Sequence, residues 1–190
     1  LNQYKKIIPS GRNLGIKISY AEQSEPRGLP EAFIIGEKFI GSDNVALILG
    51  DNFFYGKSLI NKLQNLNNLK NGAKIFLHKV KNPKLFGVAK ISAKNKIIGI
   101  KEKPKKKFSN LAITGLYFFD NKVVNFARKL KPSKRGELEI TDLLNNYLRK
   151  KELFAYPTGK DVRWFDTGSI DDYYKTIKFV ESTERNQGQK

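Results

Sequence analysis

Two aspartates that lie far apart in the sequence each follow a short apolar stretch. Asp51 comes after residues 45–49, which are all apolar, and after Gly50, where the chain can turn without a crowding side chain. Asp166 follows residues 162–165 in a similar setting. Because open α/β sheets bind ligands at the carboxyl ends of their strands, we expect both carboxylates to serve one site. Two carboxylates suit a Mg²⁺ ion that holds the phosphates of a nucleotide.

The other side chains available limit the alternatives. Asp51 taken alone would fit an ordinary turn or helix-cap aspartate, so the interpretation depends on its pairing with Asp166. The chain has one histidine, His78, which stands inside an apolar stretch and is expected to be packed there. This leaves little scope for a Ser-His-Asp triad or a histidine zinc site. The absence of cysteine excludes a disulfide framework and thiolate chemistry.

Gln23 and Gly28 stand in a turn that precedes an expected helix. The amide of Gln23 offers a donor and an acceptor to the edge of a base. Gly28 lets the backbone approach a ligand closely. The alternative is an ordinary loop followed by a helix start.

A further group of residues is suited to a sugar phosphate. Glu102 can accept hydrogen bonds from sugar hydroxyls, and Lys103 next to it can meet a phosphate as a point charge. Gly87 stands in a turn, and Gly115 in an apolar strand marks a place where a ligand can come close. The structural alternatives are a surface ion pair, a strand-opening glycine and simple strand packing.

Strands and helices are expected to alternate along the chain, which argues for a parallel sheet built from βαβ units. Strands are expected at 16–21, 45–49, 73–80, 111–119 and 153–157, with a hairpin of 88–92 and 97–101 around 94–96. Helices are expected at 29–40, 59–66, 123–130, 140–148 and 170–180. The whole of 1–190 is interpreted as a single domain.

Composition indicates a globular protein with a basic surface. Hydrophobic residues make up 39% and aromatic residues 12% of the chain, and the net charge is +18. A nucleic-acid-binding protein is the alternative that this charge suggests, but the basic residues are mostly lysines spread along the chain and no nucleic-acid motif is present. We therefore expect steering of anionic substrates and no nucleic acid partner. No stretch could cross a bilayer and no signal peptide is visible, so the cytoplasm is expected.

The motifs, taken in order, resemble those of the sugar-1-phosphate nucleotidylyltransferases. The matching segments run nearly from end to end: 23–29, 31–36, 50–52, 54–56, 86–88, 102–104, 114–117, 135–142 and 164–168. The runs Arg-Gly-Glu-Leu-Glu-Ile-Thr-Asp and Asp-Thr-Gly at this spacing are specific for the family. So many ordered matches leave chance a poor explanation.

The resemblance implies an α/β, Rossmann-like nucleotidyltransferase fold with a mostly parallel central sheet. It implies a Mg²⁺-dependent reaction of dTTP with glucose 1-phosphate that gives dTDP-glucose and pyrophosphate. A uridylyl- or cytidylyltransferase of the same family is the alternative. The implied roles are metal binding by Asp51 and Asp166, catalysis by these two and Lys103, nucleotide binding by Gln23, Gly28 and Asp51, and sugar-phosphate binding by Gly87, Glu102, Lys103 and Tyr117.

The chain departs from the family pattern in two places. The glycine-rich phosphate loop of the first β-loop-α unit is missing, and the chain contains no Met and starts with Leu1, so we expect it to begin inside a longer protein and to have little activity by itself. Phe86 stands where the family often has Tyr, which removes one hydroxyl. The resemblance also suggests a homotetramer.

Overall fold

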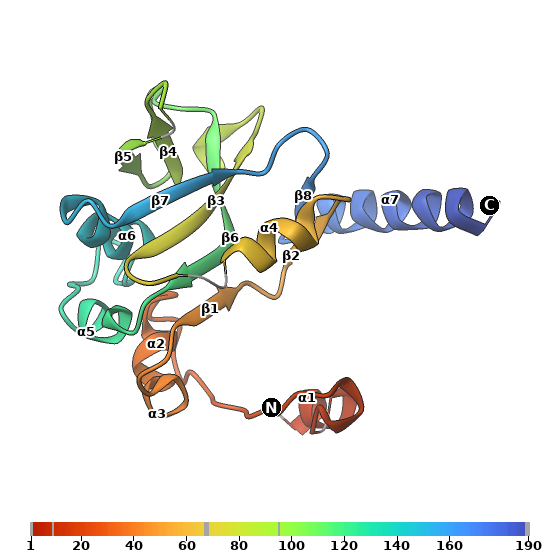
Figure 1. Cartoon of the computed structure of the whole chain (residues 1–190), viewed down its shortest axis with the longest axis horizontal. Coiled ribbons are helices and arrows are strands. Elements are labelled where there is room, and N and C mark those ends of the chain that lie inside the picture. The colour runs from red at the N-terminus through yellow and green to blue at the C-terminus, as the bar shows by residue number, and fades with distance from the viewer. Residues whose placement is uncertain (1, 9, 67–68, 95, 189–190) are drawn as a thin grey trace.

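The computed structural model describes residues 2–8, 10–66, 69–94 and 96–188, which form a six-stranded sheet and a two-stranded one (Figure 1). The larger sheet has the strand order β5-β4-β6-β3-β7, and β1 also pairs with β6; the smaller sheet joins β2 to β8. The strands are β1 (Val45–Ile48), β2 (Asn52–Tyr55), β3 (Ala73–Lys79), β4 (Val88–Ile91), β5 (Ile97–Lys101), β6 (Leu111–Phe119), β7 (Leu153–Pro157) and β8 (Arg163–Asp166).

Strand β6 is the centre of the larger sheet. Strand β3 pairs with it along one edge, from residue 111 to residue 119. The other edge is shared by β1, which pairs with residues 116–119, and by β4, whose Val88 faces Ala112. Residues 112–117 are all buried, as expected for a strand that is apolar on both faces.

The α/β class is confirmed, but the sheet is mixed and not mostly parallel. Among the described strands, β3 and β7 form the parallel pair, and the other ladders are antiparallel. Strands β1, β3 and β7 do run in one direction, because β1 and β3 are both antiparallel to β6 and β7 is parallel to β3. The expected crossovers are therefore present, but β6 inserts between β1 and β3 and separates two strands that were expected to be parallel neighbours.

The expected helices are confirmed, with small differences in their ends. They are α2 (Glu31–Ile35), α3 (Glu37–Ile40), α4 (Leu59–Leu66), α5 (Lys122–Arg128), α6 (Ile140–Arg149) and α7 (Ile170–Gly188). The sequence did not predict α1 (Asn2–Ile7) or the short 3-10 turns η1 (Arg12–Leu14) and η2 (Pro83–Leu85). The helix expected over 29–40 is divided at Gly36 into α2 and α3. Figure 1 shows α7 extending away from the sheets toward the C-terminus.

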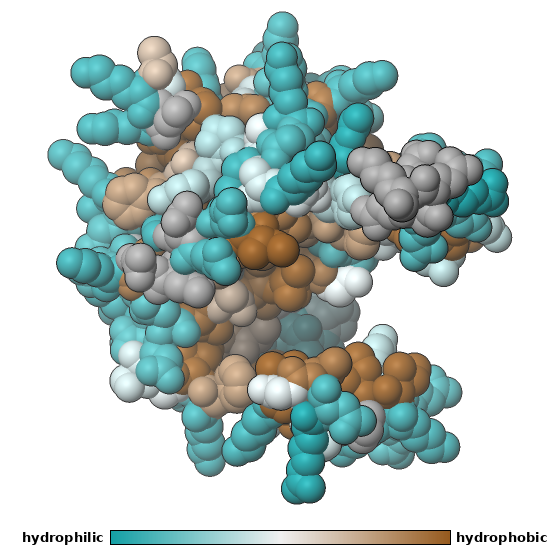
Figure 2. All heavy atoms as spheres, turned by 45° about the vertical axis from the view of Figure 1, so that its right-hand side comes forward, coloured by the Kyte–Doolittle hydropathy of each residue, from teal (hydrophilic) through white to brown (hydrophobic). Residues whose placement is uncertain are grey.

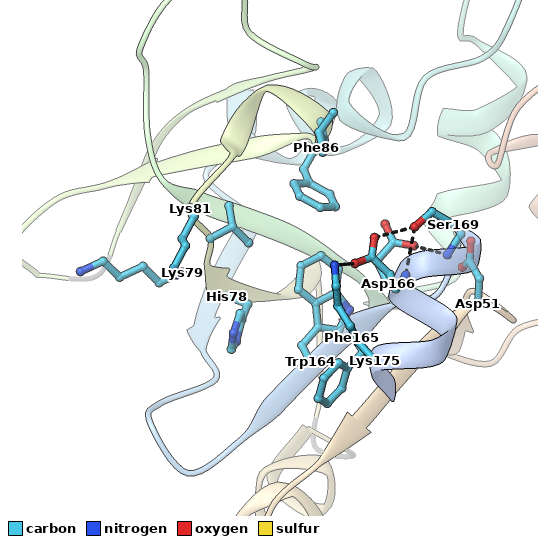
Figure 3. Close-up of a pocket in the computed structure, with 14 residues that line it drawn as sticks. Asp51, His78, Lys79, Lys81, Phe86, Trp164, Phe165, Asp166, Ser169 and Lys175 are labelled. Carbon is cyan, nitrogen blue, oxygen red and sulfur yellow. Dashed lines mark hydrogen bonds and ion pairs between the residues drawn. The ribbon is translucent and has the colours of Figure 1, made fainter. Parts of the chain in front are cut away.

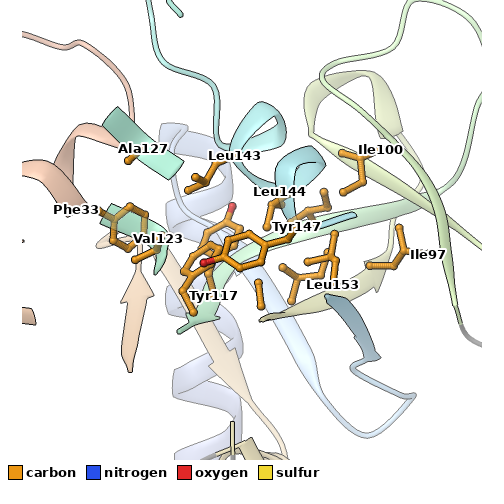
Figure 4. Close-up of a cluster of buried hydrophobic side chains, with 14 of the residues drawn as sticks. Phe33, Ile97, Ile100, Tyr117, Val123, Ala127, Leu143, Leu144, Tyr147 and Leu153 are labelled. Atoms are coloured by element: carbon orange, nitrogen blue, oxygen red, sulfur yellow. The ribbon is translucent and has the colours of Figure 1, made fainter. Parts of the chain in front are cut away.

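The main core lies between β6 and helices α2, α5 and α6 (Figure 4). The rings of Phe33 and Phe119 meet edge to face with centroids 5.1 Å apart, and Phe126 contacts Tyr147 in the same way at 4.8 Å. Leu143 and Leu144 of α6 are fully buried. The apolar residues that predicted these helices from their spacing are thus the ones that cover the sheet.

A buried carboxylate connects the sheet to the helices. Asp120, 3% exposed, accepts hydrogen bonds from the Tyr147 hydroxyl (2.7 Å) and from the Gly72 amide (2.7 Å). The ammonium of Lys122 lies 3.3 Å from its second oxygen. Each oxygen of Asp120 therefore has a partner, which compensates for its removal from water.

One strand expected from the sequence is absent, and one expected hairpin is present. Residues 16–21 form no strand, because no other described segment pairs with them and their side chains are largely exposed. The hairpin of β4 and β5 is confirmed, although Asn95 in its turn lies outside the described residues. Figure 2 shows apolar surface on the projecting N-terminal segment and on the body beside it. Tyr4 and Ile7 of α1 and Ile48 of β1 are exposed.

Candidate active site

The two-stranded sheet brings Asp51 and Asp166 together. Strand β2 begins at Asn52, directly after Asp51, and in its ladder with β8 the residue opposite Asn52 is Asp166. The backbone amide of Thr167 donates to the carbonyl of Asp51 (2.7 Å), and the Thr167 hydroxyl donates to the same oxygen (2.8 Å). The sequence placed both aspartates at strand ends, but it did not predict that the segments 52–55 and 163–166 pair with each other.

The two carboxylates face a common space beside Gly168. A Cβ atom at Gly168 would lie 3.2 Å from Oδ1 of Asp166 and 3.5 Å from Oδ2 of Asp51. Figure 3 shows both aspartates at the same end of the pocket, with His78, Lys79 and Lys81 at the other end. A glycine at this position therefore keeps open a space that is bordered by an oxygen of each aspartate.

The electrostatics of this pair suit a cation. Burial raises the pKa of Asp166, and the negative charges of Asp51 and Asp172 add to this effect. The hydrogen bond from the Gly168 amide and the charge of Lys103 act in the opposite direction. A carboxylate whose ionised form is disfavoured by burial and by neighbouring negative charge gains from a positive ion beside it.

The donor set fits a magnesium ion that retains ligands from elsewhere. Among the described residues, no group of three or more His, Cys, Asp or Glu side chains could hold a metal ion. Mg²⁺ is commonly held by one or two carboxylates together with water and substrate phosphates. Asp51 and Asp166 supply that number of hard oxygen ligands and leave the other positions for a phosphate.

A cavity of about 580 Å³ opens next to the carboxylates. Its aromatic wall contains Phe86 and Trp164, whose ring centroids lie 5.3 Å apart in an edge-to-face contact. His78 also lines it, half-buried, with Nδ1 2.8 Å from Oγ1 of Thr158. Burial lowers the pKa of His78, and the charge of Arg163 adds to this. His78 is therefore a wall residue of this cavity, whereas the sequence predicted a packed residue.

Glu102 and Lys103 follow β5 and lie against the turn at Gly87. The Lys103 amide donates to the carbonyl of Phe86 (3.1 Å), and Lys103 has a positive φ of 35°. A Cβ at Gly87 would lie 3.1 Å from Oε2 of Glu102 and 2.9 Å from Cγ2 of Thr141. The glycine thus allows the carboxylate of Glu102 to sit against the turn.

Several charges act on Glu102. Burial raises its pKa, and the nearby Glu139 adds to this, whereas Lys103, a hydrogen bond with Thr141 and Arg135 act in the opposite direction. The ionised form of Glu102 is therefore less favourable in the folded protein than in water, which is typical of residues that serve a ligand site.

The run from 135 to 142 provides the support for this charge cluster. Arg135 donates to both oxygens of Glu139, from Nε at 3.1 Å and from Nη2 at 2.6 Å, and the Ser133 hydroxyl donates to Oε1 at 2.6 Å. Burial would raise the pKa of Glu139, but these hydrogen bonds outweigh it and the net shift is downward. Glu139 remains charged and keeps Arg135 in place.

Tyr117 lies behind the site, near the C-terminal end of β6. It is 3% exposed. Burial raises the pKa of its hydroxyl, and the charges of Glu102 and Asp51 add to this. The hydroxyl of Tyr117 therefore lies within electrostatic reach of both Glu102 and Asp51, whereas the ring packs in the main core.

Gln23 and Gly28 are not among the residues that line the cavity of Asp51 and Asp166. Gln23 donates from Nε2 to the Gly28 carbonyl (3.2 Å) and to the carboxylate of Glu31 (2.6 Å). Gly28 has a φ of +100°, and a Cβ there would overlap the backbone of Leu138. The close approach that Gly28 permits in this structure is to the chain itself, and a role toward a base stays a prediction.

Asn52 is a site residue that sequence reasoning did not single out. Its amide nitrogen donates to Oδ1 of Asp51 (2.8 Å), and its oxygen accepts from the amide of Gly115 (3.1 Å) and from the indole of Trp164 (2.6 Å). The expectation that a ligand approaches Gly115 is wrong for this face, because the side chain of Asn52 occupies the space. A Cβ at Gly115 would lie 2.6 Å from Cγ of Asn52.

A model of the nucleotidyl transferase family matches residues 2–183, which cover all of the positions described above. The chain belongs to the nucleotidyl transferase family. The α/β sheet and the paired carboxylates are thus features of a nucleotidyl transferase. Among its described residues, no helix is both long and apolar enough to cross a membrane.

Curated relatives of this nucleotidyl transferase are named glucose-1-phosphate thymidylyltransferase. The protein of that name from Neisseria meningitidis serogroup A is 45% identical over 184 residues, which are 97% of this chain and 64% of the relative. The one from Mycolicibacterium smegmatis is 42% identical over 187 residues, 98% of this chain and 65% of the relative. The chain therefore spans slightly less than two thirds of the length of these relatives.

Solved structures agree with this assignment of the fold. A protein described as a glucose-1-phosphate thymidylyltransferase from Bacillus anthracis, in complex with a sucrose, has a TM-score of 0.83 and 37% identity over 92% of this chain and 70% of that chain. A UDP-glucose pyrophosphorylase complexed with UDP-glucose has a TM-score of 0.79 over 96% of this chain and 74% of that chain. At 24% identity, the latter likeness shows the fold alone.

Proposed function

We propose that the protein containing this chain transfers a thymidylyl group from dTTP to glucose 1-phosphate, giving dTDP-glucose and pyrophosphate. The observation that carries the proposal is the convergence of Asp51 and Asp166 at one end of a cavity of about 580 Å³. The names of relatives 42% and 45% identical to this chain support the choice of substrates.

The reaction is an in-line displacement at phosphorus. An oxygen of the sugar's phosphate attacks the α-phosphorus of dTTP, a new P–O bond forms, and the bond to the β-phosphate oxygen breaks as pyrophosphate leaves. A bound Mg²⁺ supplies neutralisation of the phosphate charge. Asp51 and Asp166 would hold this ion, and the remaining residues position the substrates.

The charged groups beside the metal site are suited to the sugar phosphate. Lys103 lies close enough to Asp166 for its charge to affect the pKa of that residue, so it can meet a phosphate next to the metal. Glu102 accepts from sugar hydroxyls, and Gly87, assigned to the same sugar-phosphate site, allows this carboxylate to lie against the turn. Tyr117 is assigned to the sugar-phosphate site by resemblance to the family. Gln23 and Gly28 are assigned to the base, by resemblance to the family.

Pyrophosphate release by the protein that contains this chain, measured from dTTP, UTP and CTP in turn, each with glucose 1-phosphate, tests the proposal. We expect a preference for dTTP and dependence on Mg²⁺. A strong preference for UTP or CTP would change the assignment to a uridylyl- or cytidylyltransferase. No release with any of the three would refute the proposed activity.

A homotetramer and a cytoplasmic location stay predictions. We expect no nucleic acid partner, since the cavity beside the carboxylates suits small phosphorylated substrates. Steep salt-dependent binding to duplex DNA would contradict this expectation.

A further inference from the structure

The side chain of Asn52 is held by three hydrogen bonds at the junction of three strands. Its oxygen accepts from the Gly115 amide in β6 and from the Trp164 indole in β8, and its nitrogen donates to Asp51. The backbone of Asn52 also pairs with that of Asp166 in the β2–β8 ladder. One half-buried residue therefore contacts or pairs with both aspartates of the candidate metal site.

These contacts determine which way the amide of Asn52 points. The Gly115 amide and the Trp164 indole are donors only, so the group that faces them must be the oxygen. A flipped amide would place its NH₂ group against two N–H groups and its oxygen against a carboxylate. The NH₂ group must therefore face Asp51.

This orientation distinguishes the two oxygens of Asp51. Oδ1 accepts from Asn52 at 2.8 Å. Oδ2 faces the open space at Gly168, 3.5 Å from the position of a Cβ there, with Oδ1 of Asp166 at 3.2 Å from the same point. Asn52 thus occupies one oxygen of Asp51 and leaves the other directed to the space that the two aspartates share.

We propose that Asn52 is a positioning residue that orients Asp51 for metal binding. The inference rests on the metal site of the proposed function and deepens it. Partners of metal ligands fix the orientation of those ligands, and their loss commonly reduces metal affinity about 10- to 100-fold. Because Gly115 and Trp164 hold Asn52 from two strands, the geometry of the site depends on both sheets.

The absence of a side chain at Gly115 leaves room for the amide of Asn52. A Cβ there would lie 2.6 Å from Cγ of Asn52 and 2.7 Å from its Nδ2, which is too close for the amide to keep its place. The Gly115→Ala variant should therefore weaken metal binding, although residue 115 does not face the shared space at Gly168.

Direct Mn²⁺ binding tests the inference without an activity assay. The dissociation constant is measured from the electron paramagnetic resonance signal of free Mn²⁺, for the wild type and for Asp51→Asn, Asn52→Ala and Gly115→Ala. We expect Asn52→Ala to raise the dissociation constant about 10- to 100-fold. The matched control is Asn121→Ala, which loses an amide hydrogen bond to the Ser42 carbonyl and should bind Mn²⁺ like the wild type.

Binding of glucose 1-phosphate in the presence of EDTA separates positioning from general damage to the site. We expect this metal-free affinity to be unchanged in Asn52→Ala. An equal loss of Mn²⁺ and glucose 1-phosphate binding would show a merely structural role and overturn the inference. If Asn52→Ala does not fold, Trp164→Phe removes the indole donor to Asn52, together with part of the ring, and leaves the Gly115 donor in place, so we expect a smaller weakening of Mn²⁺ binding.

The remaining outcomes distinguish this inference from the proposed function. Unchanged Mn²⁺ affinity in folded Asn52→Ala or Trp164→Phe, with clear loss in Asp51→Asn, would overturn the positioning role and leave the metal site intact. A wild type that binds no Mn²⁺, or an Asp51→Asn variant that binds it equally well, would overturn the metal site and the inference with it.

Discussion

At the scale of single residues, this protein keeps charges in places that are unfavourable for the fold. The ionised form of Asp166 is disfavoured by burial and by the neighbouring carboxylates, and that of Glu102 by burial and by Glu139. Such groups reduce stability in the absence of a ligand, and a cation or a polyhydroxylated substrate can compensate for this. Neutral replacements of these residues are therefore expected to raise stability and to lower activity or ligand affinity.

Replacing either aspartate by asparagine should stop catalysis while the fold remains. Asp51→Asn and Asp166→Asn each remove a hard anionic oxygen at nearly constant volume. We expect turnover of the protein that contains this chain to fall at least about a hundredfold, the scale on which loss of one preorganised charge-stabilising group lowers rates. The exposed Asp43→Asn is the matched control for turnover assays and melting curves. Wild-type turnover in either site variant would remove that aspartate from the metal site.

Glu102→Gln should be more stable than the wild type at neutral pH. The pKa of Glu102 in the folded protein is raised above its ordinary value of 4.5, so the folded state holds this proton more tightly than the unfolded state does. Its contribution to stability is therefore lost as the pH rises from about 4.5 through the folded-state pKa, and glutamine does not titrate.

Thermal melting across this pH range measures the effect. We expect Glu102→Gln to melt at a higher temperature than the wild type at neutral pH. The gain in the free energy of unfolding should be about 1 kcal/mol or less, and the difference in melting temperature should shrink in acid. Affinity for glucose 1-phosphate should fall at the same time. A variant that is less stable at neutral pH would show that the ionised carboxylate contributes favourable contacts that outweigh its burial.

At the scale of elements, helix α6 is fixed to the sheet by a polar contact inside an apolar interface. Tyr147 is fully buried, and its hydroxyl donates to Asp120, which follows β6 directly. The same aspartate accepts from Gly72, which precedes β3. Loss of the hydroxyl would leave a buried carboxylate oxygen without this partner, and such a loss costs more than the hydrogen bond itself contributed.

Tyr147→Phe should therefore destabilise the protein by about 1–3 kcal/mol. Urea denaturation gives the free energy of unfolding, and an unchanged m-value would show that the same surface is exposed on unfolding. The control is Tyr174→Phe, because Tyr174 is 58% exposed and should tolerate the change. Equal free energies for Tyr147→Phe and the wild type would mean that water replaces the hydroxyl at Asp120.

At the scale of the whole molecule, the exposed apolar surface near β1 stands out. Among the described residues, β1 pairs with β6 along one edge, and its other edge has no partner strand. Ile48 in this strand is 59% exposed and borders an apolar cavity with Phe53, Leu63 and Phe118. An apolar strand with an unpaired edge is a template for association with another chain.

Ile48→Lys should reduce self-association of the 190-residue chain. A lysine on an edge strand opposes edge-to-edge pairing, because approach of a second copy brings like charges together. The control is Ile170→Lys, since Ile170 is 76% exposed but lies on helix α7. Light scattering over a concentration series should show a lower apparent mass for Ile48→Lys alone. Equal scattering by both variants and the wild type would contradict a role of the β1 edge.

The sequence by itself determined most of the helices and the strands of the larger sheet, although the strand expected at 16–21 is absent. Apolar stretches identified the strands at 45–49, 73–80 and 111–119. Strands β3 and β6 are mostly buried, as expected for strands covered on both faces, whereas β1 is not, since its Ile48 is 59% exposed. Helical spacing of apolar residues identified α5 and α6. The pair Asp51 and Asp166 followed from local signals, namely a carboxylate at the expected end of each of two strands.

The tertiary structure alone decided how the strands are ordered and what holds the carboxylates. The insertion of β6 between β1 and β3 depends on long-range pairing, which local periodicity does not encode. The β2–β8 ladder joins residues 52–55 to residues 163–166, and only this pairing places Asp51 beside Asp166. Asn52 has no distinguishing local pattern; its importance arises because Gly115 and Trp164, each more than 60 residues away, both donate to its oxygen.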